Sequence, residues 1–535
     1  MEIARDMGAP ASPTPISPLY AKYVLGVLML TQVLNFIDRQ IISILAEEIK
    51  ADLGVTDAQI GFLYGTAFAV FFSVFGIPLG RLADAWVRTR LIALGIAFWS
   101  VMTALSGLSR NFATLAALRI GVGVGEATAG PSSNSLVFDY FPPKVRATAI
   151  AVYASGIYIG AGIGIFLGGA IVDAWNGAFP DHTAAPLGLK GWQAAYLAVG
   201  LPGLLVALIA ASLREPERGR LDGIAAPPPV NPWKALSSEL LTIVPPLTVI
   251  GLAKAGGRTR EFAVNAAFAA FYVLAAWGLT RLLGDPLQWI SLAIGLYAAT
   301  SWAQSLVLRD RPTFRLTFGC RTFCLTMVGF ACVAFVTYGV GFWTVPLLIR
   351  AHGVTASVAG TNGGLAASIG GLLGVTLGGV LADRLAKRTD AARYIVGMAA
   401  VISAIPVGAT YILTDNLLVA YIFLGLWCTL SSMWIGPASA AILDLVLPRM
   451  RAVASAIWIF MNTFIGLALG PFTIGRVSDA IAARTHDSPG ALTQAMLYAL
   501  AMVVVAVLLL FFAARSLRSD MAKKLDRARA AGEEL

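Results

Sequence analysis

Gly80-Arg81-Leu82-Ala83-Asp84 is the first of four copies of the pattern Gly-x-[Leu/Ile/Val]-x-Asp. The other three copies are Gly169-Ala170-Ile171-Val172-Asp173, Gly379-Val380-Leu381-Ala382-Asp383 and Gly475-Arg476-Val477-Ser478-Asp479. Each copy closes a long apolar segment, and the successive aspartates are 89, 210 and 96 residues apart. A step near 90 holds about three membrane helices of roughly 20 residues with their loops. The spacing predicts four three-helix units with an insertion between the second and third, an arrangement typical of secondary transporters.

The composition is that of a membrane protein. Hydrophobic residues make up 58% of the 535 residues, charged residues only 13%, and the mean hydropathy is +0.77. Soluble domains carry about 25% charged residues, whereas here the charges occur in short clusters between apolar runs of roughly 20 or more residues. We therefore predict an all-α polytopic membrane protein.

The net charge of +10 follows the alternation of the loops, which argues against nucleic acid as a partner. Basic residues gather around 81–90, 144–146, 384–393 and 449–451 and in the tail after 515, whereas the intervening loops are acidic or nearly neutral. This positive-inside distribution predicts that both termini are cytoplasmic. The polar, proline-rich start lacks the order of a cleavable signal, so we expect a multi-pass protein of the cell membrane, in bacteria the inner membrane.

The residues that could carry chemistry do not indicate an enzyme. Cys320, Cys324, Cys332 and Cys428 lie in or beside apolar segments, where a free thiol packs as a small hydrophobe. No cluster of His, Cys and carboxylates has the spacing of metal ligands, and the glycine-rich stretches lack the Gly-Lys-Ser/Thr ending of a phosphate-binding loop. We expect no metal and no cofactor, and a membrane receptor or enzyme is the weaker alternative.

Each half of the chain contains six predicted spans. They are 21–46, 57–81, 89–109, 113–138, 147–174 and 192–213, then 317–349, 354–382, 393–413, 416–444, 452–478 and 491–514. The spans form two six-helix bundles, 21–213 and 317–516, between cytoplasmic tails at 1–20 and 517–535. Asp139 and Arg146 flank a proline after the fourth span as Asp444 and Arg451 do after the tenth. This match predicts parallel halves related by a pseudo-two-fold axis, each built from two inverted units.

Residues 214–316 separate the two bundles. They open with a linker containing the stiff run Pro227-Pro228-Pro229. The segment 233–253 is moderately apolar but broken by prolines, so we predict that it lies in the membrane interface. The segments 262–283 and 286–308 are predicted as two extra transmembrane helices, because an even number keeps the second bundle in register with the positive-inside rule. The prediction is fourteen spans, with twelve as the alternative.

Four ionisable residues fall inside predicted spans: Asp38 and Arg39 in the first, Arg119 and Glu126 in the fourth. At about 1.5 Å rise per residue, Asp38 and Arg119 lie at similar depth, so we expect an ion pair between them. A charge near the bilayer centre costs on the order of 2.5–3.5 kcal/mol even on the gentlest scale. We therefore favour a functional role over a purely structural network, with Glu126 or Asp38 as proton carrier and the arginines setting its proton affinity.

Two sets of motifs resemble a known family. The stretch 80–90 resembles the loop signature after the second helix of the major facilitator superfamily, and 379–388 repeats it. Asn35-Phe36-Ile37-Asp38-Arg39 resembles the first-helix signature of its Spinster group, and 119–127 resembles the fourth-helix signature. The resemblance covers nearly the whole chain except the tails and 214–316. It implies a rocker-switch transporter with a central cavity between the halves; animal members export lysolipids and sphingosine phosphate.

The resemblance also implies roles for individual residues. Asp38, Arg39, Arg119 and Glu126 would serve proton coupling or substrate contact. A cytoplasmic gate that is made and broken during the cycle would consist of Asp84, Arg88, Arg146 and, in the repeated motif, Asp383. The fifth span has glycines every four residues but lacks the proline of a common antiporter pattern, so close packing explains the spacing at least as well as antiport does.

Polar and aromatic residues inside the spans mark the expected cavity wall. They are Asn35, Asn134, Tyr153, Tyr158, Tyr338, Trp343, Trp434, Trp458 and Asn462. Intramembrane charges are nearly confined to the first half, and the second half offers aromatic rings and amides, which suits an amphipathic ligand with its polar head near Arg39 or Arg119. We predict a monomeric, proton-coupled exporter of an amphipathic or lipid-like molecule. A gradient-independent facilitator of a small organic solute is the alternative.

Overall fold

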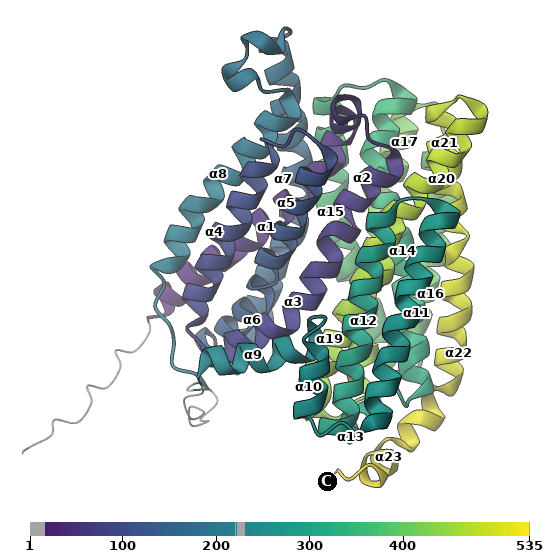
Figure 1. Cartoon of the computed structure of the whole chain (residues 1–535). Coiled ribbons are helices and arrows are strands. Elements are labelled where there is room, and N and C mark those ends of the chain that lie inside the picture. The colour runs from purple at the N-terminus through teal and green to yellow at the C-terminus, as the bar shows by residue number, and fades with distance from the viewer. Residues whose placement is uncertain (1–16, 220, 222–230, 534–535) are drawn as a thin grey trace, which may run out of the picture.

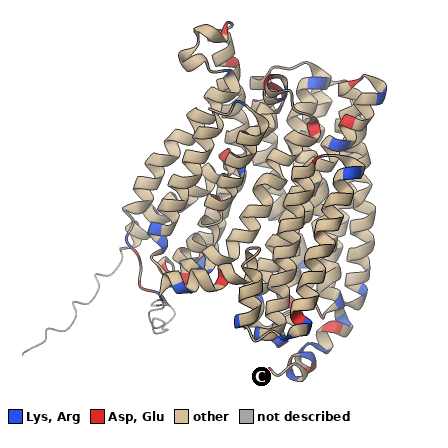
Figure 2. Ribbon diagram, viewed as in Figure 1, with Lys and Arg blue, Asp and Glu red and all other residues tan. Residues whose placement is uncertain are grey.

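The chain folds into a bundle of long helices (Figure 1). The computed structural model describes residues 17–219, 221 and 231–533, so most of the predicted N-terminal tail and the proline run 227–229 lie outside the described residues. Within these ranges there is no strand, and 14 helical segments are long and apolar enough to cross a membrane. The predicted all-α polytopic fold is confirmed. Lys, Arg, Asp and Glu lie mainly at the two ends of the bundle (Figure 2).

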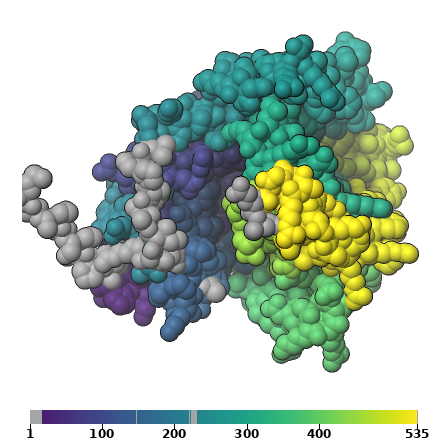
Figure 3. Space-filling model, turned by 90° about the horizontal axis from the view of Figure 1, so that it is seen from below, coloured from purple at the N-terminus to yellow at the C-terminus, as the bar shows by residue number. Residues whose placement is uncertain are grey.

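The two ends of the described chain lie at the same end of the bundle (Figure 1). Helix α1 (Pro18–Leu53) starts there, and the last short helix, α23 (Lys524–Ala530), lies there too. We call this end the terminal face and the opposite end the far face. Figure 3 views the molecule from the terminal face, where the N-terminal and C-terminal parts of the chain lie side by side.

The N-terminal half consists of eight helices that form six spans. They are α1, α2 (Asp57–Tyr64), α3 (Thr66–Ala85), α4 (Arg88–Ser106), α5 (Phe112–Glu126), α6 (Ala129–Tyr140), α7 (Pro143–Ala178) and α8 (Gly191–Ala211). Two short 3-10 helices, His182–Ala184 and Pro186–Gly188, precede α8 on the far face. The second span breaks at Gly65, where a Cβ atom would lie 2.3 Å from the main-chain oxygen of Leu467. Glycine therefore allows this span to touch the other half through its backbone.

The C-terminal half repeats the six-span plan. Its helices are α14 (Arg321–His352), α15 (Ala356–Ala386), α16 (Ala392–Leu413), α17 (Leu417–Ser432), α18 (Ile435–Asp444), α19 (Arg451–Met461), α20 (Gly470–Thr485), α21 (Ser488–Leu500) and α22 (Met502–Ala522). A 3-10 turn at Pro448–Met450 precedes α19, and a π-helical stretch, η5 (Asn462–Leu469), joins α19 to α20. Such stretches are frequent at functional sites.

Within its described residues, the insertion between the halves forms five helices. They are α9 (Pro232–Ile243), α10 (Thr248–Lys254), α11 (Thr259–Leu283), α12 (Pro286–Arg309) and α13 (Arg311–Leu316). Helices α9 and α10 meet at a bend of 109°, and α11 and α12 are the two extra spans (Figure 1). Gly295 of α12 packs against Val70 of α3 and Phe464 of η5. The hairpin of α11 and α12 therefore lies against the line where the two halves meet.

A polar network holds the α11–α12 hairpin together inside an apolar surrounding. Nδ2 of Asn265 on α11 donates to Oγ of Ser301 at 2.7 Å and to Oε1 of Gln304 at 3.0 Å. The Tyr297 hydroxyl donates to Oδ1 of Asn265 at 2.7 Å. In a membrane such hydrogen bonds between helices contribute about 0.6–2 kcal/mol each, so Asn265 is the main polar link of the hairpin.

We expect Asn265→Val to loosen this hairpin, because three hydrogen bonds to α12 are lost and their partners stay buried. The apparent melting temperature of the purified protein in detergent should fall by several degrees, corresponding to roughly 1–3 kcal/mol. Val273→Ala on the exposed side of α11 is the matched control and should change the melting temperature little. Equal effects of the two substitutions would show that the network contributes nothing.

Candidate functional site

The four ionisable side chains predicted inside the membrane all lie buried in the N-terminal half. Asp38 and Arg39 are on α1, and Arg119 and Glu126 are on α5, which ends at Glu126. Each of the four residues is less than one-tenth exposed, and Arg119 is completely buried. The two helices thus bring two acids and two bases together within an apolar bundle.

Arg39 and Glu126 form the ion pair of this cluster. Nη2 of Arg39 lies 2.9 Å from Oε2 of Glu126 and 3.4 Å from Oδ1 of Asn35, one turn earlier on α1. The guanidinium carbon of Arg39 also lies 4.3 Å from the ring centre of Phe68 and 4.7 Å from that of Phe36. Because aromatic faces attract a desolvated cation, the arginine is held by charge and by ring contacts together.

The predicted ion pair between Asp38 and Arg119 is wrong. Nη1 of Arg119 instead donates a hydrogen bond of 3.1 Å to the main-chain oxygen of Asp38. The carboxylate of Asp38 has Thr103 and Trp99 of α4 around it, together with the charge of Arg119. Adjacent residues on a helix point about 100° apart. Because α1 turns Arg39 toward Glu126, Asp38 must face α4. The prediction compares only the depths of the two residues in the membrane. Depth does not determine the direction in which each side chain points around its helix.

Several polar atoms of the cluster have no hydrogen-bond partner within the described part of the chain. They are Oδ1 of Asp38, Nε of Arg39, Nε and Nη2 of Arg119 and Oε1 of Glu126. Buried polar groups are otherwise nearly always paired. The cluster therefore has unused capacity to hold a proton, a water molecule or the polar part of a ligand.

The predicted cavity residues of the N-terminal half lie in different settings. Asn35 belongs to the charged cluster, and the Tyr153 hydroxyl donates to Oε1 of Gln32 at 2.8 Å, which links α7 to α1. The ring of Tyr158 lies against Gly371 of α15, where the two halves meet. Asn134 on α6 is exposed and not in contact with the cluster through any hydrogen bond described here. Asn35 and Tyr153 thus make hydrogen bonds within the N-terminal half, and Tyr158 lies at the contact between the two halves. Asn134 makes no described hydrogen bond to these residues.

In the C-terminal half two of the predicted aromatic residues, Trp434 and Trp458, form a cluster with Phe330. The rings of Trp434 and Trp458 meet edge to face with their centres 6.0 Å apart, and Phe330 stacks on Trp434 at 6.0 Å. Nε1 of Trp434 and Oδ1 of Asn462 are buried without a hydrogen-bond partner in the described residues. This cluster presents large apolar faces together with two unused polar atoms.

Two further predicted cavity residues differ from one another. Tyr338 on α14 is half-buried. Trp343 is completely buried, and its Nε1 donates to the main-chain oxygen of Pro471 at 2.9 Å. Trp343 therefore packs α14 against α20, and its role as a cavity-lining residue stays a prediction. A tryptophan on an apolar helix can serve either role, and the sequence pattern alone does not distinguish them.

Ion pairs between side chains join the two halves at the far face. Arg350, near the end of α14, donates from Nη1 and Nη2 to the two carboxylate oxygens of Asp57 at 2.8 and 2.7 Å, and from Nε to Oε1 of Glu47 at 2.8 Å. Lys50 also pairs with Asp57 at 2.7 Å. Bidentate arginine–carboxylate pairs are among the stronger polar contacts in proteins, so this group closes the far face.

Two of the four repeated aspartates reinforce this closure by capping helices of the opposite half. The carboxylate of Asp479, on α20, accepts from the main-chain nitrogens of Asp57 and Ala58 at 3.0 and 2.8 Å, at the start of α2. Asp173, on α7, accepts from the main-chain nitrogen of Ser357 at 2.7 Å, at the start of α15. A carboxylate at a helix N-terminus satisfies free N–H groups and favours the helix dipole.

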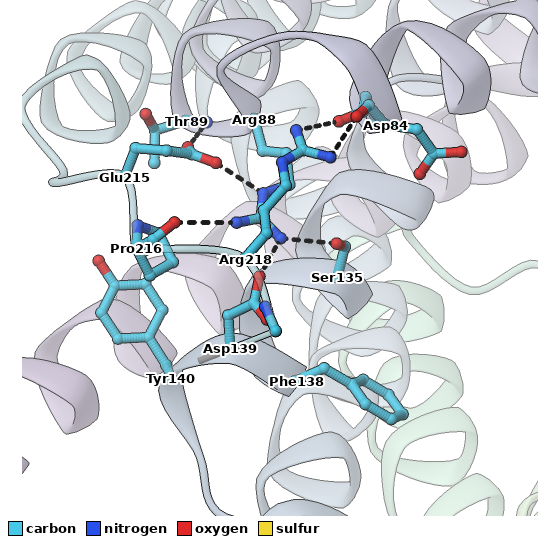
Figure 4. A network of polar contacts seen from close by, with 12 residues as sticks. Asp84, Arg88, Thr89, Ser135, Phe138, Asp139, Tyr140, Glu215, Pro216 and Arg218 are labelled. Carbon is cyan, nitrogen blue, oxygen red and sulfur yellow. Dashed lines mark hydrogen bonds and ion pairs between the residues drawn. The ribbon is translucent and has the colours of Figure 1, made fainter. Parts of the chain in front are cut away.

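The terminal face of the N-terminal half has its own charged network (Figure 4). Arg88 donates from Nε to Oε1 of Glu215 at 2.6 Å and from Nη1 to Oδ2 of Asp139 at 2.5 Å. Glu215 also accepts from the main-chain nitrogen of Thr89 at 3.1 Å. Arg218 donates to three main-chain oxygens at the end of α3, those of Ala83, Asp84 and Trp86. These bonds connect the N-terminal half to its own linker.

None of the hydrogen bonds and ion pairs described for the predicted gate residues joins the two halves. Arg88 pairs within the N-terminal half, and the carboxylate of Asp84 has Arg81 at 4.0 Å. Arg146 donates to main-chain oxygens at the end of α6. Asp383 is exposed at the end of α15 and makes no ion pair with a described residue. The aspartates at the terminal face thus lack the cross-half contacts that their counterparts make at the far face.

On the C-terminal side of this face, Arg449 links the insertion to the C-terminal tail. Its Nη1 lies 2.9 Å from Oδ2 of Asp310, and it also pairs with Glu533. Burial raises the pKa of Asp310, but the hydrogen bonds from Arg449 and Thr313 outweigh burial and hold that pKa below its ordinary value. The pair is therefore ionised at neutral pH.

Sequence reasoning missed the far-face group of Glu47, Asp57 and Arg350. The charge pattern predicts only that the loops at this end are acidic or nearly neutral, and it assigns no role to Arg350. One signal is present in the sequence: Arg350 is a base at the end of a span on the side where the positive-inside pattern expects few bases. A base at that end predicts an acidic partner in another loop.

We expect Glu126→Leu to destabilise the protein by about 3–5 kcal/mol, because it leaves the buried Arg39 without a counter-ion. The double variant Arg39→Met/Glu126→Leu should recover most of this loss, since a buried pair replaced by apolar residues is often neutral. Denaturant unfolding of the purified protein for the wild type, both single variants and the double variant measures the coupling. Additive losses would contradict the pairing.

The geometry can be compared with known proteins. The model of the Major Facilitator Superfamily matches residues 28–471. An MFS-type efflux pump of Mycolicibacterium smegmatis is 26% identical over 490 residues, 92% of this chain and 90% of that protein. Protein spinster of Drosophila melanogaster is 23% identical over 478 residues, which are 87% of this chain and 63% of the fly protein.

A solved structure of similar architecture agrees with these matches. It is the crystal structure of a bacterial homologue of the human lysosomal transporter Spinster, in an inward-facing and unoccupied conformation. It is 27% identical, has a TM-score of 0.70, and the match covers 94% of this chain and 99% of that chain. The resemblance seen in the helix signatures is thereby confirmed. The chain belongs to the Major Facilitator Superfamily, and within it the chain is similar to the Spinster proteins.

Proposed function

We propose that this chain is a proton-coupled secondary transporter that exports an amphipathic small molecule by alternating access. The observation that carries the proposal is the buried cluster of Asp38, Arg39, Arg119 and Glu126, with its unpaired polar atoms, inside a transporter fold. The similarity to an efflux pump supports export. The superfamily and the fold are those of transporters rather than enzymes.

Glu126 is the proposed proton carrier. When ionised, it neutralises Arg39 at 2.9 Å. A proton on Glu126 removes the negative charge and leaves the arginine unpaired in a medium of low dielectric constant, which is costly. The cost favours either an anionic group of the substrate beside Arg39 or a conformation that admits water. Asp38 is the second candidate, because its carboxylate is buried and its Oδ1 is unpaired.

An amphipathic substrate fits the asymmetry of the two halves. Arg39 and Arg119 would receive the polar head, and the rings of Phe330, Trp434 and Trp458 would line the path of the apolar body. Aromatic side chains offer large apolar contact areas at low cost in conformational entropy. The unpaired Nε1 of Trp434 would take one further polar group of the substrate.

The four repeated aspartates support the proposal of alternating access. In this structure Asp173 and Asp479 cap helices of the opposite half at the far face, and Asp84 and Asp383 are free of such contacts at the terminal face. By the inverted repeat, we propose that Asp84 caps the start of α19 and Asp383 the start of α7 when the terminal face closes. The two sets of caps would then exclude each other, because one rigid half cannot tilt toward both faces.

The charge distribution gives the proposed orientation. Basic residues gather on the terminal face (Figure 2), so we propose that this face and both termini are cytoplasmic and that the state described here opens inward. The chain would act as a monomer in the cell membrane, in bacteria the inner membrane. Its fourteen spans and apolar outer surface fit the bilayer as its main partner.

In liposomes that contain the purified protein, an amphipathic substrate should drive a proton flux that an internal pH dye records. Glu126→Gln should lower this flux at least tenfold, because a neutral amide cannot carry the proton, and Asp38→Asn should do the same if both acids take part. Asp181→Asn, in an exposed far-face loop, is the control and should leave the flux unchanged.

The same assay separates the alternatives. Substrate movement without any proton flux in the wild type would favour a gradient-independent facilitator. Full proton-coupled transport by both neutral variants would contradict proton carriage by this cluster. Transport of sugars or free amino acids, with no movement of lysolipids or other amphipaths, would contradict the proposed substrate class.

We expect Asp173→Ala/Asp479→Ala to shift the protein toward the state that is open at the far face, because alanine has no side-chain oxygen to accept these hydrogen bonds. Each lost cap costs about 0.5–2 kcal/mol, so the ratio of the two states should change by roughly tenfold or more. Spin labels at Ala184→Cys and Leu418→Cys, in a background without native cysteines, report the distance between the halves at this face. The distance distribution should gain a longer component.

The matched control is Asp415→Ala, which removes a far-face carboxylate that caps no described helix of the other half. It should leave the distances as they are. If the double variant and the control give the same distribution, the two repeated aspartates do not hold the far face closed.

A further inference from the structure

A groove opens between three helices of the C-terminal half near the terminal face. It has a volume of about 710 Å³, with α15 and α16 as its walls and α17 as its floor. Gly378 presses α15 onto α17 so closely that a Cβ atom there would lie 1.9 Å from the main-chain oxygen of Met433. Helix α15 thus packs closely against α17 at this level, and the groove lies on its other side, between α15 and α16.

The inside of the groove is apolar and its rim is basic. Apolar lining comes from Leu381 of α15, Ile395 and Ala399 of α16, and Leu430 and Met433 of α17. Leu381 and Ile395 are each about two-fifths exposed although they lie on spans. The apolar wall is thus open to whatever surrounds the bundle, which in a membrane is lipid.

Three cations line the rim at the end of α15, namely Arg384, Lys387 and Arg388. All three are exposed, and none makes an ion pair with a described residue. Other arginines of the terminal face are paired: Arg88 with Asp139, Arg393 with Asp444 and Arg449 with Asp310. Of the nearby acids, Asp383 does not line the groove, and Asp390 pairs with Arg518 at 3.5 Å. The rim therefore carries an uncompensated positive charge.

We propose that this groove binds an anionic phospholipid from the leaflet on the side of the chain termini. The phosphate contacts Arg384, Lys387 and Arg388, and an acyl chain lies between α15 and α16 on the floor formed by Leu430 and Met433. Anionic headgroups are attracted to basic residues at the membrane surface, and the apolar groove below the rim distinguishes a lipid from a soluble anion. The site lies outside the buried cluster of the N-terminal half and does not depend on the proposed function.

The test is native mass spectrometry of the full chain in detergent, titrated with phosphatidylglycerol or with phosphatidylcholine of the same acyl chains. The wild type should retain phosphatidylglycerol more strongly than phosphatidylcholine. Arg384→Gln/Lys387→Gln/Arg388→Gln should weaken this binding by roughly tenfold or more, since each charge near the surface contributes to it. Arg90→Gln/Lys144→Gln/Arg315→Gln removes three exposed cations elsewhere on the same face and should keep the lipid.

A second variant tests the apolar part of the site. Ala399→Trp fills the groove and keeps the rim charges, so it should also lose phosphatidylglycerol. The rim variant replaces only exposed side chains, so it serves as the folded comparison if Ala399→Trp does not yield a monodisperse protein.

Three results would overturn the proposal. Equal loss of lipid in the rim variant and in the control triple variant would show attraction by net charge alone. Displacement of the lipid by millimolar glycerol 3-phosphate would assign the rim to a soluble phosphate. Loss of phosphatidylglycerol in Arg39→Gln, with full retention in both groove variants, would place the lipid in the centre of the N-terminal half.

Discussion

The closure of the far face by carboxylates that cap helices of the opposite half is the contact on which the arrangement of this molecule depends. Asp173 and Asp479 join α7 to α15 and α20 to α2, and Arg350 adds a bidentate pair to Asp57. Such contacts need the two halves to meet backbone to backbone, as at Gly65. Since these contacts lie at one end, the other end is free to separate, and the buried cluster of α1 and α5 lies between the two.

The cost of a buried charge explains why the cluster is confined to two helices. A lone ion in the bilayer is expensive, so each of the two acids lies near a base of the neighbouring helix. Only one geometrically good pair results, that of Arg39 with Glu126, and Asp38 keeps an unpaired oxygen. An arrangement built for stability alone would satisfy every one of these atoms. The unsatisfied atoms are therefore the physical reason to regard the cluster as functional.

The architecture was predictable because span length and charge alternation follow directly from the bilayer. The spacing of the four aspartate motifs predicts the repeated three-helix units. The positive-inside rule predicts an even number of inserted spans. The site was predictable only in part. The presence of charge inside a span identifies Asp38, Arg39, Arg119 and Glu126. The partner of each side chain depends on the rotation of its helix about its own axis. Asp38 and Arg119 are the example, because they lie at similar depth and yet do not form an ion pair. Whether Trp343 packs between helices or lines a cavity depends on the position of the neighbouring helix. The sequence pattern gives no information about that position.

The insertion shows how a repeat fold can accept extra helices. Helices α11 and α12 form a pair that is joined by the hydrogen bonds of Asn265, and α11 exposes apolar side chains such as Phe271 and Trp277. A two-helix unit returns the chain to the face from which it left, so the second bundle keeps its orientation. Arg476 holds the turn of the hairpin through the main-chain oxygen of Leu283. Because Arg476 lies within the fourth repeated motif, the insertion is attached to the same helix that supplies Asp479, and the two are expected to move together.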